Sequence, residues 1–549
     1  MTKRCVILFL FVSVFILFIT SCGSTSANTS TNANTTETTT PATEPKEPAM
    51  STPPVTTTPI TTTPVTEGPK PTTITIDETF KIVYSSSASA AEKEAANQII
   101  NAMSHFGVTL SVQKDTASQS GNEILIGNTS RSQSKSALEA LSAGGYSLSI
   151  SENETNGVSL VLAAIDEDGL ELATKHLILN YLSVDKKATL PFSLSVTHTK
   201  DNVTLQEKYQ LSDYTVVYAK EGILSDVNIQ SAKYADAARD FASLVEKFTG
   251  HTLTVVPDTA DLSQYQHLIL FGNTSASDDN VVYSASFFKG GVKLYGVKML
   301  DNGNISLAGN NPVSAYAAGE ALLAAIAENN NRVNELEFTG QKDIIHVACL
   351  GDSITFGTGS ADPSIHCYPV YYQRMLGYNY YVEKYGLPSH SLIETDQPSY
   401  LNHDYFRKSA AAKPDVVIVM LGTNDTRPSR WADSAYKDWS DPARTQAFLN
   451  SGNKLVENYR KANPDVQIIF ATCPFVQQAA DWTNNLIKYG NPLINQIAST
   501  NNCSVIDIFT YTKKNIHMFA GSDGLHLKDE NYEKLAKGFY ELTKNIIKK

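Results

Sequence analysis

The chain has 549 residues, of which 42% are hydrophobic, so it is long enough to bury more than one core. Its formal net charge is −12, and no stripe of lysine and arginine is visible in the sequence. Because binding to a polyanion needs clustered basic side chains, this composition argues against nucleic acid as a partner.

Residues 1–21 have the pattern of an export signal. Lys3 and Arg4 form a basic n-region, and the apolar run from Val6 to Ile19 is shorter than the usual membrane-spanning helix. Cys22 follows small residues in a sequence that resembles a lipobox. The resemblance implies that the peptide is removed and Cys22 is lipidated, giving an exported lipoprotein anchored to the bacterial membrane at the cell surface. A plain signal peptide with an incidental Cys22 is the alternative.

Residues 22–73 are nearly all Ser, Thr, Pro, Asn and Glu, with repeated Thr-Pro units. Such a segment lacks the apolar surface that would offset the entropy cost of ordering. We therefore expect a disordered Thr/Pro-rich tether, stiffened by proline, that holds the folded part away from the membrane.

An internal repeat follows, with copies at residues 74–200 and 201–340. Each copy predicts a strand, a helix, further strands and a closing helix, which indicates a small α/β layer fold. In both copies a strand runs into Gly-Asn-Thr, at Asn128 and at Asn273, where a turn is a better interpretation than a ligand site. The unit resembles the α/β accessory domain that precedes the catalytic barrel of bacterial β-N-acetylhexosaminidases and α-glucuronidases, which implies a carbohydrate-processing context.

The last segment, residues 341–549, carries the polar residues that suggest chemistry. The apolar run from Val347 to Leu350 predicts a buried parallel strand, and it ends in Gly351-Asp352-Ser353. Ligands bind at the carboxyl ends of strands in open α/β sheets, so Ser353 is a candidate nucleophile.

Two later motifs complete a set of reactive groups. A second buried-strand run, 415–421, ends in Gly-Thr-Asn-Asp, so Asn424 can offer its amide to the same crevice. Asp523 lies three residues before His526, a spacing at which the carboxylate can accept from one ring nitrogen while the other faces Ser353. The set contains a nucleophile, a base, an orienting carboxylate and an oxyanion donor.

These motifs resemble the ordered blocks of the SGNH hydrolases, also called the GDSL esterase family. Gly351-Asp352-Ser353 corresponds to the first block, Gly422-Thr423-Asn424-Asp425 to the third, and the segment from Asp523 to His526 to the fifth. The resemblance implies an α/β fold with a flavodoxin-like parallel sheet and helices on both faces. It also implies catalysis by Ser353, His526 and Asp523. The oxyanion hole would be formed by the backbone N–H of Ser353, that of a second-block glycine, and Asn424.

The second block departs from the family pattern. Ser389 stands where the family has its oxyanion glycine, in the stretch that begins at Lys384 and includes Gly386. A backbone N–H survives this change, but glycine is favoured where the chain takes a positive φ or approaches a ligand closely. We assign Gly386 and Trp431 to the substrate pocket; for Trp431, stacking on a sugar ring and anchoring a loop both stay open.

Several other side chains have plainer interpretations. Cys349, Cys367, Cys473 and Cys503 can be buried free thiols or disulfide partners. Asp352 and Asp425 are expected to hold their own turns through local backbone N–H groups. No His or Cys spacing predicts a zinc site, and ester hydrolysis by a serine needs no metal or organic cofactor.

The sequence thus predicts a surface-anchored serine esterase that removes O-acetyl groups from a glycan. Two alternatives remain. One is a lipid or thioester hydrolase of the same fold, and the other is a catalytically impaired glycan-binding lipoprotein.

Overall fold

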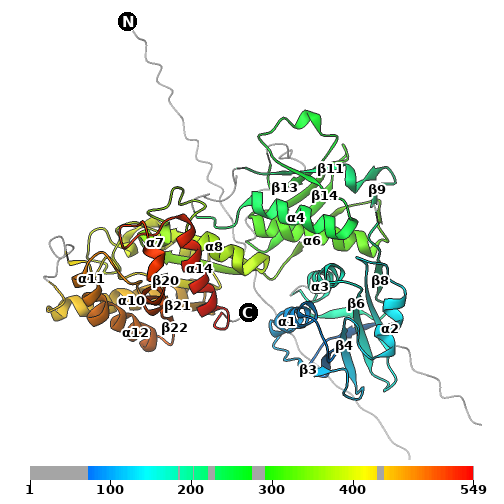
Figure 1. Cartoon of the computed structure of the whole chain (residues 1–549), viewed down its shortest axis with the longest axis horizontal. Coiled ribbons are helices and arrows are strands. Elements are labelled where there is room, and N and C mark those ends of the chain that lie inside the picture. The colour runs from blue at the N-terminus through cyan, green and yellow to red at the C-terminus, as the bar shows by residue number, and fades with distance from the viewer. Residues whose placement is uncertain are drawn as a thin grey trace, which may run out of the picture. The chain divides into compact units, whose positions relative to one another are not determined.

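The computed structural model describes residues 72–183, 186–201, 203–220, 229–274, 291–428 and 438–547 (Figure 1). The expected signal peptide, Cys22 and nearly all of the Thr/Pro-rich tether lie outside these residues, as does Trp431. Within them, no helix combines the length and the apolar character needed to cross a membrane.

The first repeat contains a six-stranded sheet of order β3-β2-β4-β6-β5-β8. Four neighbouring strands run parallel, and β5 is antiparallel to both of its neighbours. The strands are β2 (Phe80–Tyr84), β3 (Ser111–Lys114), β4 (Asn122–Ile126), β5 (Tyr146–Glu152), β6 (Val158–Ala164) and β8 (Ser195–His198). The helices are α1 (Ala90–Ser104), α2 (Ser132–Glu139) and α3 (Glu167–Tyr181), and a small ribbon pairs β1 (Thr73–Thr75) with β7 (Thr189–Pro191).

The second repeat has the same topology. Its sheet has the order β12-β11-β13-β15-β14-β17, with the same pattern of parallel and antiparallel neighbours. The strands are β11 (Tyr214–Tyr218), β12 (Thr254–Pro257), β13 (His267–Phe271), β14 (Leu294–Met299), β15 (Ile305–Gly309) and β17 (Glu337–Gln341). The helices are α4 (Tyr234–Thr249) and α6 (Pro312–Glu328), and a small sheet joins β9 (Thr204–Leu205), β10 (Tyr209–Gln210) and β16 (Arg332–Val333).

The Gly-Asn-Thr motifs form matching turns. Gly127 and Gly272 have φ of +68° and +81°, a conformation that glycine adopts without a steric penalty. The N–H groups of Thr129 and Thr274 donate to the carbonyls of these glycines at 3.2 and 3.1 Å. The two motifs are therefore turns, as expected from their composition.

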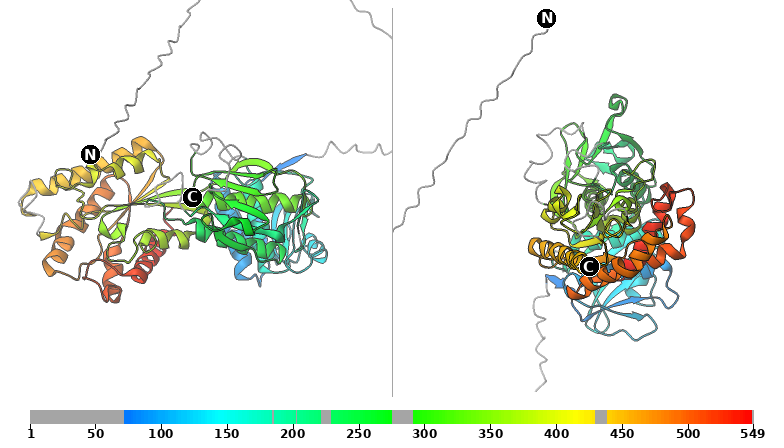
Figure 2. Two further views of the ribbon diagram at one scale, coloured as in Figure 1. Left: turned by 90° about the horizontal axis from the view of Figure 1, so that it is seen from above. Right: turned by 90° about the vertical axis from the view of Figure 1, so that its left-hand side faces the viewer.

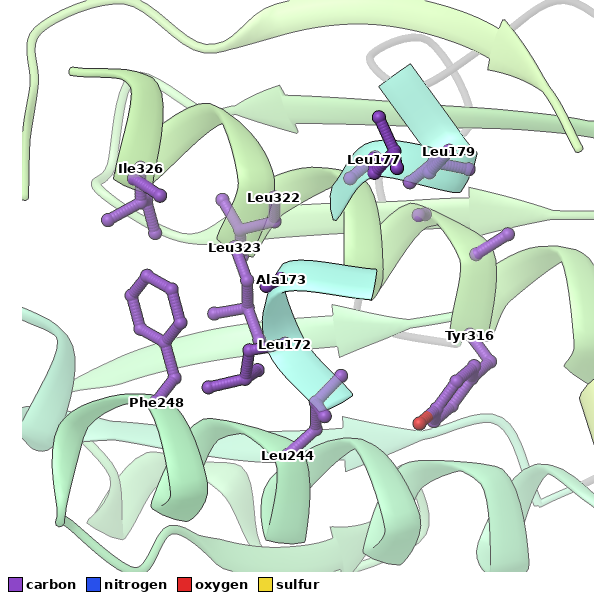
Figure 3. Packing of buried hydrophobic residues seen from close by; sticks show 14 of the residues in the cluster. Leu172, Ala173, Leu177, Leu179, Leu244, Phe248, Tyr316, Leu322, Leu323 and Ile326 are labelled. Atoms are coloured by element: carbon purple, nitrogen blue, oxygen red, sulfur yellow. The ribbon is translucent and has the colours of Figure 1, made fainter. Parts of the chain in front are cut away.

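Apolar residues from helices of both repeats pack together (Figure 3). Leu172 and Ala173 of α3 belong to one buried cluster with Leu244 of α4 and Leu322 of α6. Each fully buried aliphatic side chain of this kind contributes about 1.5–3 kcal/mol. Burial of this shared surface gives the two repeats one continuous core.

The last part of the chain contains a five-stranded, fully parallel sheet of order β19-β18-β20-β21-β22. This is the flavodoxin-like order 2-1-3-4-5, so the predicted α/β fold is confirmed. The strands are β18 (Ile345–Gly351), β19 (Tyr380–Gly386), β20 (Val416–Met420), β21 (Gln467–Ala471) and β22 (Ser504–Ile506). Strand β18 is buried throughout because both faces of the sheet are covered by helices (Figure 2).

The helices around this sheet fall into two contacting groups, one containing α8 and α14 and the other α9, α10 and α12. They are α7 (Ser353–Phe356), α8 (Tyr368–Leu376), α9 (Asp404–Ala411), α10 (Pro442–Ala462), α11 (Ala480–Asn485), α12 (Asn491–Thr500), α13 (Ile508–Lys514) and α14 (Asp529–Thr543).

A short segment of the second repeat pairs with the edge of this sheet. Gln230 bridges Glu383 of β19 in the antiparallel sense. The N–H of Ser231 donates to the carbonyl of Val382 at 3.1 Å, and that of Lys384 donates to the carbonyl of Ile229 at 2.6 Å. These bonds satisfy backbone groups that an uncovered edge strand would expose.

Candidate active site

Ser353 lies in a tight turn where β18 ends and α7 begins. Asp352 caps this short helix, its Oδ1 accepting from the N–H of Ile354 at 3.0 Å, which is the turn-holding role expected for it. A Cβ on Gly351 would lie 2.0 Å from Oγ1 of Thr355, so only glycine fits there. The Ser353 side chain is thereby fixed at the carboxyl edge of the sheet.

The Asp523–His526 turn brings an imidazole to this serine. Nε2 of His526 lies 2.9 Å from Oγ of Ser353, and Nδ1 lies 2.7 Å from Oδ2 of Asp523. The other carboxylate oxygen accepts from the N–H groups of Leu525 and His526 at 2.9 and 2.7 Å. A serine, a histidine and a carboxylate thus form one continuous hydrogen-bonded chain.

The hydrogen bonds of this side-chain triad favour the His526 tautomer that carries its proton on Nδ1. Partial burial acts to raise the pKa of Asp523, but the hydrogen bonds from His526 and the backbone outweigh it and leave the pKa below its usual value. An ionised Asp523 accepts the Nδ1–H, so Nε2 presents its lone pair to Ser353. In this arrangement Nε2 can take the serine proton.

Contacts outside the motifs hold the serine and histidine segments together. Gly359, with φ of +95°, packs so closely that a Cβ there would lie 3.0 Å from the Cβ of His526. The Tyr532 hydroxyl donates to the carbonyl of Thr358 at 2.7 Å, and Asp529 accepts from the N–H of Ala361 at 2.7 Å. Sequence reasoning missed these residues, since isolated glycine and tyrosine residues carry no recognisable spacing.

The second-block loop takes the strained conformation that its sequence implies. Ser389 has φ of +65°, a region where a serine is disfavoured relative to glycine. The loop is tied to the strand before the nucleophile, because the N–H of Leu387 donates to the carbonyl of Gly351 at 2.9 Å. A serine side chain is accommodated at this position without loss of the backbone N–H.

Asn424 lies beside that loop. Its Nδ2 donates to the carbonyl of His390 at 3.1 Å, and the side chain is buried. The third-block amide and the second-block loop are therefore in direct contact.

A buried cluster of charged side chains holds the segment that follows Ser389 in place. Both oxygens of Asp425 accept backbone N–H groups, from Leu392 and Ile393, at 2.9 Å each. Burial raises the pKa of Asp425 to about 6. The fully buried Arg444 donates to the carbonyl of Asp425 at 2.7 Å and pairs with Asp396 at 3.6 Å. The prediction that Asp425 holds its own turn is wrong, because its carboxylate binds N–H groups of a loop more than 30 residues earlier in the chain. The sequence gave no signal for Arg444.

The structure gives a packing role to one of the two residues assigned to the pocket. Gly386 is buried, and a Cβ there would lie 2.2 Å from the backbone nitrogen of Phe356. Gly386 therefore allows β19 to pack against the nucleophile helix, and its assignment to the substrate pocket stays a prediction. Trp431 lies outside the described residues, whereas Trp482, which the sequence did not single out, donates from Nε1 to the carbonyl of Thr423 at 2.8 Å.

The structure also describes the four cysteines of this region and the side chains that could bind a metal. Cys349, Cys367, Cys473 and Cys503 are free thiols, and all but Cys503 are buried, so the free-thiol alternative holds. In the part of the chain that the structure describes, no three His, Cys, Asp or Glu side chains gather in a way that could hold a metal ion.

Known proteins resemble the part of the chain that holds this site. Residues 349–534 match the model of the GDSL-like lipase/acylhydrolase family. An acetylxylan esterase from Xylanibacter ruminicola is 37% identical over 91 residues, which cover 17% of this chain and 19% of that protein. The chain therefore spans about a fifth of the length of this curated relative.

Two solved structures are also similar. A putative GDSL-like lipase from Parabacteroides merdae is 15% identical, with a TM-score of 0.30, and the match covers 37% of this chain and 97% of that one. A putative arylesterase from Agrobacterium tumefaciens is 19% identical, with a TM-score of 0.29, and the match covers 37% of this chain and 100% of that one.

Proposed function

We propose that the chain is a serine esterase that removes O-acetyl groups from carbohydrate, because residues 349–534 match the model of the GDSL-like lipase/acylhydrolase family. The observation that carries the proposal is the hydrogen-bonded series from Ser353 through His526 to Asp523. A serine, a base and an orienting carboxylate in this order are suited to acyl transfer.

In the first half of the reaction, Oγ of Ser353 attacks the ester carbonyl while Nε2 of His526 takes the hydroxyl proton. The carboxylate of Asp523 stabilises the imidazolium that forms. The tetrahedral intermediate collapses when the ester C–O bond breaks and His526 returns its proton to the departing sugar oxygen. Ser353 then carries the acetyl group.

In the second half, His526 takes a proton from water as the water oxygen attacks the acetyl carbonyl. The second tetrahedral intermediate releases acetate, and the proton returns to Oγ of Ser353. In both halves the developing oxyanion is held by the backbone N–H groups of Ser353 and Ser389 and the amide of Asn424.

An acetylated sugar is the substrate class that the similar proteins favour. The curated relative that shares 37% identity with part of this chain is named an acetylxylan esterase. The repeats add support, because the sequence of each resembles an accessory domain of glycan-processing enzymes. Xylan, another plant or host polysaccharide and peptidoglycan remain the candidate backbones.

Replacing the nucleophile tests the proposal. The Ser353→Ala variant should lose acetate release from acetylated oligosaccharides, whereas Ser364→Ala, a change in the neighbouring exposed loop, should keep it. Acetate release by the Ser353→Ala variant at the rate of the unmodified protein would refute the assignment.

Two measurements separate the alternatives. Labelling of Ser353 by a fluorophosphonate probe distinguishes an enzyme from a catalytically impaired glycan-binding protein. Hydrolysis rates on acetyl and octanoyl model esters distinguish a sugar deacetylase from a lipid or thioester hydrolase, since the former should prefer the acetyl ester.

The location of the enzyme is part of the same proposal. The lipobox-like sequence at Cys22 supports export and anchoring to the bacterial membrane through a lipid, with the Thr/Pro-rich segment as a tether. Incorporation of labelled fatty acid into the native chain, and its loss in the Cys22→Ala variant, tests this directly. Equal labelling of both would contradict it.

A further inference from the structure

Arg427 lies next to the proposed oxyanion donor. It is the third residue after Asn424, and its N–H donates to the carbonyl of Asn424 at 3.2 Å. The side chain is exposed at the end of the third block. Arg427 thus follows the proposed oxyanion donor within one turn of the chain after β20.

A buried indole fixes the position of this guanidinium. The centre of the Arg427 guanidinium lies 5.4 Å from the centroid of the Trp482 ring. Trp482 is only 3% exposed, and its Nε1 also lies 3.3 Å from Oγ1 of Thr426. Stacking on a fixed ring orients the planar guanidinium and leaves its edge N–H groups directed at acceptors in its own plane.

The indole lies on a helix whose preceding loop also contacts the turn that carries His526. Trp482 lies on α11, and the loop before this helix contacts Gly524, because the N–H of Gln477 donates to the carbonyl of Gly524 at 2.8 Å. Thr483 ties the same helix to the loop through its hydroxyl bond to the carbonyl of Val476 at 2.5 Å. Arg427 is thus held on the side of the site that joins the third block to the His526 turn.

The charge of Arg427 is not neutralised within the described part of the chain, where it forms no ion pair with a carboxylate. Other arginines of the same domain do form such pairs, namely Arg374 with Asp236, Arg407 with Asp404 and Arg444 with Asp396. A chain of net charge −12 would repel an acidic glycan unless a cation stood at the site. Arg427 supplies that cation.

We propose that Arg427 binds a carboxylate of the substrate, so that the enzyme prefers O-acetylated glycans that contain uronic acid residues. The edge of a guanidinium matches a carboxylate through two parallel N–H···O bonds. This inference rests on the proposed deacetylase function and specifies its substrate class. A purely structural Arg427, which only covers Trp482, would give no discrimination between acidic and neutral glycans.

The test compares two acetylated oligosaccharides of the same backbone, one neutral and one carrying a uronic acid, with the full chain as the enzyme. The ratio of kcat/KM on the acidic substrate to that on the neutral one should fall about fivefold in Arg427→Gln, mainly through KM. Arg427→Lys should lose less, because it keeps the charge, and Lys488→Gln should leave the ratio unchanged as an exposed cation of the same region. Raising the salt concentration should lower the ratio for the unmodified protein but not for Arg427→Gln.

The outcomes distinguish failure of this inference from failure of the proposed deacetylase function. Acetate release from both substrates with a ratio that Arg427→Gln does not change overturns the inference and leaves the deacetylase proposal standing. The same holds if Lys488→Gln lowers the ratio as much as Arg427→Gln does. Failure of the unmodified enzyme to release acetate from either oligosaccharide overturns the deacetylase proposal, and the inference with it.

Discussion

Replacing Asp523 with alanine should lower kcat for ester hydrolysis by about 30- to 200-fold. The reaction places a positive charge on the imidazole of His526, whose Nδ1 lies 2.7 Å from Oδ2 of Asp523. Two opposite charges about 4 Å apart attract each other by about 1 kcal/mol in water and by about 4 kcal/mol at an effective dielectric constant of 20. Because the Asp523 side chain is 46% exposed, the loss falls between these limits, at about 2–3 kcal/mol.

Steady-state kinetics with a small acetyl ester measure this loss directly. Asp481→Ala is a suitable control, because it removes an exposed carboxylate on α11 without touching the triad. Because the Asp523 side chain is 46% exposed, water can replace it at the N–H groups of Leu525 and His526 in the alanine variant, so the thermal unfolding should change little. An Asp523 variant that keeps more than a third of the original kcat would refute this reasoning. So would a variant whose kcat falls by more than about 10⁴-fold, as in a site that excludes water.

Four further substitutions have definite expected outcomes. Asn424→Ala should lower kcat by about 10²–10³-fold, measured as acetate release with circular dichroism as the folding control. Ser389→Gly should raise the free energy of unfolding by about 0.5–1 kcal/mol in urea titrations while kcat stays within about threefold, because the strain at φ of +65° is relieved and the N–H remains. Gly386→Ala should cost about 3 kcal/mol or more, because its Cβ would lie 2.2 Å from a backbone nitrogen; unchanged urea unfolding would contradict the packing role. Burial lowers the pKa of His198 from 6.5 to about 4, so as the pH falls the unfolded chain takes up this proton before the folded chain does. The free energy of unfolding should therefore decrease, by at most about 3 kcal/mol, between about pH 6.5 and pH 4. Urea unfolding at several pH values should show a smaller drop for His198→Gln than for the unmodified chain.

Local spacing was enough to predict several contacts. Asp523 and His526 are three residues apart, so a single turn brings the carboxylate to Nδ1 whatever the rest of the chain does. The apolar run before Ser353 predicted a buried strand, and the glycine after it a tight turn, because both patterns depend on the residues themselves. Even the strained φ of Ser389 could be anticipated, since glycine is the usual residue at that place in the family.

Contacts between distant segments could not be predicted in this way. Nothing in the spacing of Gly359 or Tyr532 reveals that these residues hold the histidine turn against the nucleophile loop. The packing of Gly386 against Phe356 was not predicted, because a glycine in a motif is equally compatible with close backbone packing and with ligand approach. Trp482 was overlooked because it lies 59 residues after Thr423, the residue whose carbonyl it binds.

The sequence by itself determined the order of strands and helices, the repeated α/β unit and the chemical identity of the reactive groups, because these depend on hydrophobic period and short-range spacing. Only the tertiary structure decided that Nε2 of His526 reaches Oγ of Ser353 across 173 residues of chain, at 2.9 Å. It also decided that the guanidinium of Arg427 lies over the ring of Trp482, 55 residues further along the chain. The physical reason is that such distances depend on how strands pair and helices pack, and these arrangements are set by the whole core and not by any one segment.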